Sequence, residues 1–162
     1  MSRAISKAPS LSRLRDDAVE AAHAAGRVLL KHFGKKLIIR EKDGAGLVTQ
    51  ADTQAEAAAL RILRKSRPDF GILAEESAPQ ENASPSRGRW IIDPLDGTTN
   101  FVHRFPMFCV SIAAEWEGEI VAGVVYHPVL KDTYVAVRGK GATINGTRMK
   151  TSATSRLTNS LL

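Results

Sequence analysis

The sequence has a single cysteine, Cys109, among 162 residues, and aromatic residues make up 6% of it. One cysteine excludes a disulfide framework, and its place in an apolar run favours a small core side chain over a nucleophile. No apolar run approaches the ~20 residues that span a bilayer, and the first residues lack the apolar segment of a signal peptide. We therefore expect a soluble, cytoplasmic protein with no membrane partner.

Acidic residues are outnumbered by basic ones, so the formal net charge is +6 and the isoelectric point is about 9.8. The basic residues gather in two clusters, at residues 27–42 and 61–67. Neither cluster alternates with aromatic residues, which serve as stacking platforms for single-stranded nucleic acids. The spacing favours solvated helix faces. A non-catalytic basic module that binds RNA or protein stays open as an alternative.

Hydrophobic residues make up 43% of the chain, which is enough for a buried core, and no linker or repeat divides it. Apolar residues at helical spacing predict helices over residues 10–33 and 53–66. We expect an α+β fold in which these two helices pack on a largely antiparallel sheet, with a flexible segment at residues 1–9 and loops at residues 43–46 and 78–87. The predicted strands are residues 36–40, 47–50, 72–74, 89–92, 108–116, 119–127 and 133–137.

The most informative stretch is WIIDPLDGTTNF at residues 90–101, where Asp93 and Asp96 lie three residues apart after an apolar strand. Pro94 has no backbone donor, so we expect the chain to leave the sheet there and place both acids on a turn. Two carboxylates and the intervening Leu95 carbonyl are the hard oxygen ligands that Mg²⁺ prefers. A capped turn without any ligand is the simpler alternative for this stretch alone.

The residues that follow predict an anion site beside the metal. Gly97 allows the backbone to approach a ligand closely, and residues 98–100 can open a helix whose free N–H groups attract phosphate.

Two other segments also bring acids to the ends of predicted elements. Glu75 and Glu76 follow the short strand at residues 72–74, and side chains alternate along a strand, so we expect one of them to face the site. Asp52 lies at the start of the second helix. For each acid taken singly, a solvated surface charge is the alternative.

The ordered set of Asp52, Glu75, Glu76 and the motif at residues 93–100 resembles the inositol monophosphatase family, part of the Mg²⁺-dependent, lithium-sensitive sugar phosphatase superfamily. The resemblance extends through FVHRFP at residues 101–106 and GKGA at residues 139–142 to residue 151. It implies a layered αβ sandwich of the sugar-phosphatase type for residues 10–162, and a homodimer.

The resemblance also implies roles for individual residues. Glu75, Asp93 and the Leu95 carbonyl would bind a first Mg²⁺, and Asp93 and Asp96 would contribute to a second. The catalytic set would be Asp52, Thr98 and Glu75, in which Thr98 and Asp52 assist the attacking water. The Gly97 and Thr98 amides would hold the substrate phosphate, and Glu76 would support the metal ligands from behind.

Two departures from the family pattern are visible. Ala74 stands where the family usually has glycine. The C-terminal motif Trp-Asp-x-Ala-Ala-Gly, whose aspartate completes the second metal site, has no counterpart, and residues 159–162 read as the opening of a buried strand. We therefore expect the N-terminal part of such a domain, truncated at its C-terminus and impaired in catalysis.

The function that the resemblance implies is hydrolysis of a phosphate monoester by a metal-activated water, with myo-inositol monophosphate as the expected substrate. The motif indicates a metal site and a phosphate site, but it does not indicate which alcohol carries the phosphate. A sugar, histidinol or nucleotide phosphatase is therefore the alternative within the same class.

Overall fold

The computed structural model describes residues 8–42, 46–77 and 87–160. The expected flexible segment at residues 1–9 and the expected loops at residues 43–46 and 78–87 lie largely outside the described residues.

The two long helices begin at side-chain caps. Helix α1 (Leu11–His32) starts after Ser10, whose side chain accepts a hydrogen bond from the backbone near the first turn. Helix α2 (Gln50–Ser66) starts after Thr49, which forms a reciprocal capping box with Asp52. The predicted helix at residues 10–33 is confirmed. The second helix was predicted to begin at residue 53, but it begins three residues earlier, at Gln50. The prediction followed the apolar residues, and the capping residue lies before the first of them.

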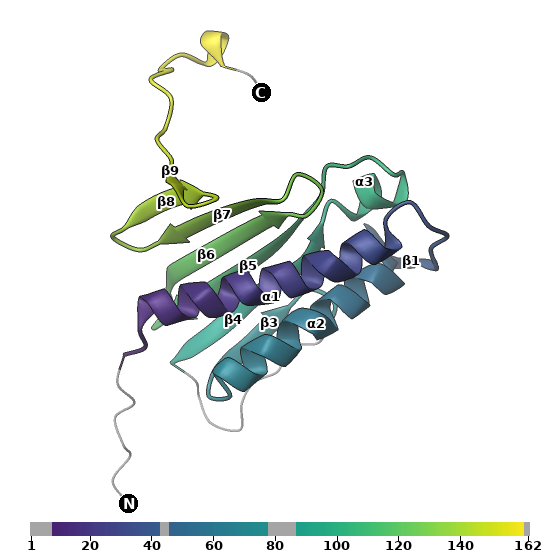
Figure 1. Cartoon of the computed structure of the whole chain (residues 1–162), viewed down its shortest axis with the longest axis horizontal. Coiled ribbons are helices and arrows are strands. Elements are labelled where there is room, and N and C mark those ends of the chain that lie inside the picture. The colour runs from purple at the N-terminus through teal and green to yellow at the C-terminus, as the bar shows by residue number, and fades with distance from the viewer. Residues whose placement is uncertain (1–7, 43–45, 78–86, 161–162) are drawn as a thin grey trace, which may run out of the picture.

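Helices α1 and α2 lie side by side and run in opposite directions on one face of the sheet (Figure 1). His32, at the end of α1, contacts Gln54 near the start of α2, with 3.0 Å between Nε2 and Oε1. At the other end, the Asp17 carboxyl hydrogen-bonds the Ser66 side chain. Side-chain contacts thus tie the pair together at both ends.

The main sheet has seven strands in the order β3-β4-β5-β6-β7-β8-β9, and β1 and β2 form a separate antiparallel pair. Strands β3 and β4 are parallel, and all other neighbours in the main sheet are antiparallel. The expectation of two helices on a largely antiparallel sheet is confirmed. The strands are β1 (Ile39–Lys42), β2 (Gly46–Thr49), β3 (Gly71–Ala74), β4 (Gly88–Asp96), β5 (Cys109–Trp116), β6 (Glu119–His127), β7 (Asp132–Val137), β8 (Gly141–Ile144) and β9 (Thr147–Arg148).

Two tight turns set the register of the antiparallel strands. Glu117 and Gly118 join β5 to β6 with φ of 54° and 83°, and Asn145 and Gly146 join β8 to β9 with φ of 48° and 82°. Two successive positive φ angles are the mark of a type I′ hairpin turn.

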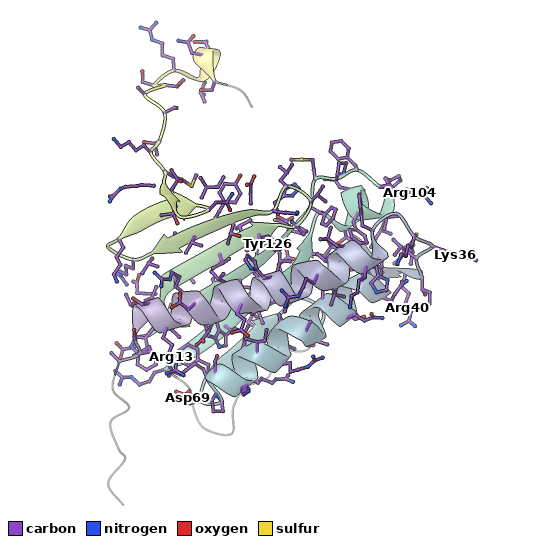
Figure 2. All side chains as sticks on the ribbon, viewed as in Figure 1. Arg13, Lys36, Arg40, Asp69, Arg104 and Tyr126 are labelled. Atoms are coloured by element: carbon purple, nitrogen blue, oxygen red, sulfur yellow. The ribbon has the colours of Figure 1, made fainter. Side chains whose placement is uncertain are left out.

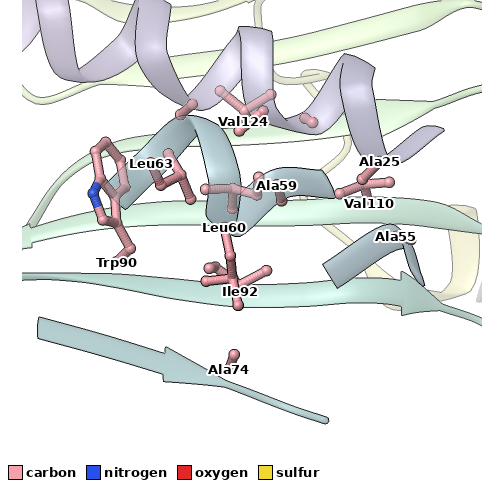
Figure 3. Close-up of a cluster of buried hydrophobic side chains, with 14 of the residues drawn as sticks. Ala25, Ala55, Ala59, Leu60, Leu63, Ala74, Trp90, Ile92, Val110 and Val124 are labelled. Atoms are coloured by element: carbon pink, nitrogen blue, oxygen red, sulfur yellow. The ribbon is translucent and has the colours of Figure 1, made fainter. Parts of the chain in front are cut away.

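The core lies between the helices and the sheet. Leu60 and Leu63 of α2 lie over Trp90 and Ile92 of β4, and all four side chains are buried (Figure 3). Small side chains on the inward faces of both helices permit a close approach. The buried alanines are Ala18, Ala21, Ala22, Ala25, Ala51, Ala55 and Ala59.

Gly26 marks the closest approach of α1 to the sheet. A Cβ atom there would lie 2.5 Å from Cε1 of Tyr126, whose ring lies against α1 (Figure 2) and packs on His23 with 4.3 Å between centroids. We expect Gly26→Val to lower the free energy of unfolding by about 1–3 kcal/mol, because overpacking forces the ring to move. Urea unfolding followed by circular dichroism measures this. Ala57→Val, at an exposed position on α2, is the control and should cost only a few tenths of a kcal/mol.

The described residues contain no helix that combines the length and the apolarity needed to cross a bilayer. At the C-terminal end, residues 150–160 are exposed and project away from the sheet (Figure 1). Asn159 belongs to a 3₁₀ turn (Leu157–Asn159), so the expected strand opening at residues 159–162 is wrong for Asn159 and Ser160. Residues 161–162 lie outside the described residues.

Candidate metal and phosphate site

The acidic motif lies on the final residues of β4 and not on a turn outside the sheet. Strand β4 continues through Pro94 to Asp96, which pairs with Cys109 of β5, and the register shifts between Asp93 and Asp96. A proline is tolerated at such an irregularity because its missing N–H breaks no ladder bond there. The expectation that Pro94 ends the strand is therefore wrong. The Leu95 N–H donates to Asp93 Oδ1 at 3.0 Å, which holds the carboxylate at the bend.

Glu75 comes to Asp93 from the neighbouring parallel strand. Ala74 pairs with Ile92, and the Glu75 N–H donates to the Ile92 carbonyl at 3.1 Å. The next residue along each strand is therefore an acid at the same edge of the sheet, and the Glu75 and Asp93 side chains are hydrogen-bonded to each other. This is the juxtaposition that the sequence predicted.

The pairing of Glu75 with Asp93 changes the pKa of Asp93. Burial, the nearby charge of Glu75 and the hydrogen bond between the two carboxyls raise the pKa of Asp93 to about 7. Asp96 adds to the rise, and the Leu95 N–H opposes it. A carboxyl whose ionisation is disfavoured by burial and by a neighbouring acid lies where a cation would favour its charged form.

The donor set fits a hard divalent cation in its chemistry, since it consists of carboxylate and carbonyl oxygens. In the described ranges, no three His, Cys, Asp or Glu side chains converge closely enough to enclose a metal ion by themselves. The Leu95 carbonyl accepts the Thr98 hydroxyl at 3.0 Å. The assignment of Glu75, Asp93, Leu95 and Asp96 as metal ligands stays a prediction.

Cys109 lies beside the site and not in the core where it was expected. It is half-buried, with Sγ 3.5 Å from Asp96 Oδ2. Burial, followed by the charge of Asp96 and the hydrogen bond to it, raises the thiol pKa to about 12. The thiol therefore stays protonated at neutral pH, as a non-nucleophilic residue should.

Asp52 lies in the first turn of α2 and Thr98 lies at the start of the short helix after β4, and their side chains are hydrogen-bonded. The Thr98 hydroxyl lies 3.1 Å from Asp52 Oδ1. The second oxygen of Asp52 accepts the Thr49 N–H at 2.9 Å and the Thr49 hydroxyl at 2.6 Å. Asp52 is 1% exposed, so its carboxyl group is shielded from solvent and each of its oxygens accepts a hydrogen bond. The catalytic roles of both residues stay predictions.

Gly97 links β4 to the short helix α3 (Thr98–Val102). Its φ is +94°, and a Cβ atom would lie 3.0 Å from the Met107 carbonyl oxygen. Both the backbone angle and the space therefore require glycine. The predicted helix opening after Gly97 is confirmed, and the binding of phosphate by the Gly97 and Thr98 amides stays a prediction.

Sequence reasoning missed Glu56, which is 3% exposed on α2. Its Oε2 accepts the Glu76 N–H at 2.9 Å, and its Oε1 accepts the Ser77 hydroxyl. Glu56 thus anchors the chain just after Glu75 and fixes where β3 ends. Its position four residues after Asp52, on the same inward face, was the available signal. Glu76 joins the network through its backbone, and its supporting role behind the ligands stays a prediction.

We expect Glu56→Ala to lower the free energy of unfolding by about 2–3 kcal/mol, because it leaves the half-buried Glu76 N–H without its acceptor and opens a cavity on α2. Glu56→Gln is the matched control. Its amide can still accept from Glu76 and donate to Ser77, so most of the stability should remain. Guanidinium unfolding of both variants measures the difference, and equal losses would contradict the anchoring role.

Residues 10–162 match the sequence pattern of the inositol monophosphatase family. The chain belongs to the inositol monophosphatase family. It is 42% identical over 153 residues to the inositol-1-monophosphatase of Mesorhizobium japonicum (strain LMG 29417 / CECT 9101 / MAFF 303099), an alignment that covers 93% of this chain and 57% of the relative.

Solved structures agree with the family assignment. The extragenic suppressor protein suhB from Bartonella henselae superimposes with a TM-score of 0.85 at 45% identity, covering 89% of this chain and 56% of that one. An IMPase/NADP phosphatase complexed with NADP and Ca²⁺ gives a TM-score of 0.80 at 26% identity, covering 93% and 58%. The inositol monophosphatase family is metal-dependent. The chain spans a little over half the length of the relatives that it matches.

Proposed function

We propose that the protein containing this chain is an Mg²⁺-dependent phosphoric monoester hydrolase that acts on inositol monophosphate. The observation that carries the proposal is the convergence of two oxygen clusters on one motif. Glu75 and Asp93 meet at the ends of β3 and β4, while Asp52 and Thr98 hydrogen-bond at the start of α3. Membership of the family supports the same reaction.

The proposed metal ligands for a first Mg²⁺ are Glu75, Asp93 and the Leu95 carbonyl, with Asp93 and Asp96 contributing to a second. When bound, the metal would lower the pKa of a coordinated water and neutralise charge on the phosphoryl oxygens. The Leu95 N–H holds one oxygen of Asp93, which keeps the carboxyl at the bend where it meets Glu75.

Thr98 and Asp52 would receive the proton of the attacking water. The Thr98 oxygen accepts that proton while its own hydroxyl proton moves to Asp52 Oδ1, 3.1 Å away. The three groups that hold Asp52 in place, two from Thr49 and one from Thr98, keep its acceptor oxygen aligned. General-base assistance of this kind contributes about 10²–10⁴-fold in rate.

The substrate phosphate would lie against the backbone amides of Gly97 and Thr98. The left-handed backbone of Gly97 directly before α3 supports this assignment, because successive N–H groups in such a conformation form anion-binding concavities. Glu76 would hold the end of β3 behind Glu75. We further propose a homodimer, which size-exclusion chromatography with light scattering can test.

The test follows phosphate release from inositol 1-phosphate in the presence of Mg²⁺ and after its removal with EDTA. Release should depend on Mg²⁺ and be lost in Asp93→Asn, while Asp16→Asn, on the exposed face of α1, should leave it unchanged. We expect slow turnover by the 162-residue chain, so Mg²⁺ binding is measured beside it by calorimetry. Undiminished release by Asp93→Asn would overturn the proposal.

Fructose bisphosphate, histidinol phosphate and a nucleotide bisphosphate should be assayed under the same conditions. A higher kcat/KM for one of them would reassign the alcohol and leave the metal chemistry in place.

A further inference from the structure

A groove of about 550 Å³ runs between α1 and α2 on their outer faces. The inward faces of both helices are buried in the core, whereas the residues that line the groove are exposed or half-buried. The groove therefore lies on the opposite side of α2 from Asp52 and Glu56, and the proposed catalytic chemistry makes no use of it.

The charged residues that line the groove are all cations: Arg27 and Lys31 on α1 and Arg61 on α2. All three are exposed, and among the described residues no carboxylate forms an ion pair with them. Residues 21–36 contain no acid at all, and residues 53–68 contain only Glu56, which faces inward. No ion pair among the described residues therefore neutralises these three cations.

The floor of the groove is apolar and shallow. It is formed by Ala24 and Val28 on α1 and by Ala57, Ala58 and Ile62 on α2. The alanines leave room for side chains to enter from outside, and the two aliphatic residues are half-buried and offer apolar contact. A row of small apolar residues between rims of positive charge is a surface that a third helix can fill.

We propose that this groove docks an acidic amphipathic helix of a partner protein. Leucine-type side chains at i, i+3, i+4 and i+7 would enter the floor, and flanking glutamates or aspartates would pair with Arg27, Lys31 and Arg61. The cations continue past the end of α1 to Lys36 and Arg40, which lie at that end of the molecule (Figure 2). This gives a longer acidic segment further pairing positions and speeds its association.

Two other occupants fit less well. A second copy of the chain would bring the same basic surface against itself, and the chain already carries a net charge of +6. Like charges brought together at an interface cost several kcal/mol. A nucleic acid would find the cations but no stacking platform, since none of the described residues that line the groove is aromatic.

The test uses fluorescence anisotropy with a labelled helical peptide of about 18 residues, or five turns, that has leucines on one face and glutamates elsewhere. A matched peptide with glutamine in place of glutamate is the probe control. The full 162-residue chain should bind the acidic peptide at least about tenfold more tightly than the glutamine peptide. The double variant Arg27→Glu, Arg61→Glu should lose at least about tenfold in affinity for the acidic peptide.

The matched protein control is Arg148→Glu, Lys150→Glu, which makes the same change in net charge at exposed positions in β9 and just beyond it. It should bind the peptide like the wild type. Equal losses in both double variants would overturn the proposal, because binding would then follow net charge alone. Equal binding of the two peptides would also overturn it.

Two further measurements test whether the groove binds another occupant. If a single-stranded RNA of 20 nucleotides binds more tightly than the acidic peptide and loses affinity in the groove variant, the surface is a nucleic-acid site. If the wild type dimerises and the groove variant does not, the surface is an interface between copies. Circular dichroism confirms that each variant is folded.

Discussion

Replacing Asp93 by asparagine is expected to weaken Mg²⁺ binding by more than about 100-fold. Loss of a residue that merely supports a metal ligand already costs about 10–100-fold in affinity, and Asp93 is proposed to touch both ions. Asparagine keeps the oxygen that accepts the Leu95 N–H, so the bend in β4 should survive. Isothermal titration with Mg²⁺ or Mn²⁺ measures the loss, with Asp16→Asn as the control.

The same substitution is expected to stabilise the metal-free chain at alkaline pH. The pKa of Asp93 is raised from 3.8 to about 7 in the folded state. Folding therefore favours the protonated carboxyl, and this contribution to stability is lost as the pH rises through about 7. Asparagine cannot ionise, so the variant escapes the loss. Because the site is half-buried and solvent screens it, the gain at pH 8 should be on the order of 1 kcal/mol.

Thermal unfolding in EDTA at pH 5 and pH 8 tests this gain. The stability of Asp93→Asn relative to the wild type should increase between the two pH values. A variant that is less stable than the wild type at pH 8 would show that Asp93 is a structural turn residue, which was the simpler alternative for the motif.

The second large effect is expected from the Asp52 and Thr98 pair. Thr98→Ala removes the hydroxyl that is proposed to relay the proton, so the hydrolysis rate should fall by about 10²–10⁴-fold while the affinity for Mg²⁺ changes little. Asp52→Asn should give a similar loss of rate, because an amide cannot take the proton. Single-turnover assays with excess protein follow the rate, and calorimetry follows the metal.

Thr98→Ser separates a chemical role from a packing role. Serine keeps the hydroxyl and loses one methyl group, so most of the rate should return. If serine and alanine are equally slow, or if Mg²⁺ affinity falls in step with the rate, Thr98 supports the metal site and does not relay a proton.

Local patterns predicted much of the fold. The predicted strand at residues 119–127 is observed with the same bounds, and it follows the turn at Glu117 and Gly118, where both φ angles are positive. The beginning of α2 was misplaced because Thr49 and Asp52 cap it before the apolar stripe starts. The end of β4 was misplaced because proline is read as a strand terminator, whereas here it lies where the register shifts and no ladder N–H is needed.

The candidate site was predicted less completely, for a physical reason. The alternation of side chains left open which of Glu75 and Glu76 faces Asp93, and the choice of Glu75 came from the family resemblance. The facing side chain depends on the register between β3 and β4. Glu56 was missed because a single acid among alanines is usually interpreted as a solvated surface residue. Its burial follows from the packing of α2 on the sheet, which no short window of sequence contains.

Helix α2 carries Asp52 and Glu56 four residues apart, one turn and about 6 Å along its axis. The first residue holds Thr98, and the second holds the chain that leaves β3 beside Glu75. The helix therefore fixes the distance between the proposed proton acceptor and the proposed metal ligands. A rotation or slide of this helix would displace both groups at the same time, so repacking its buried leucines should alter cation affinity and turnover together.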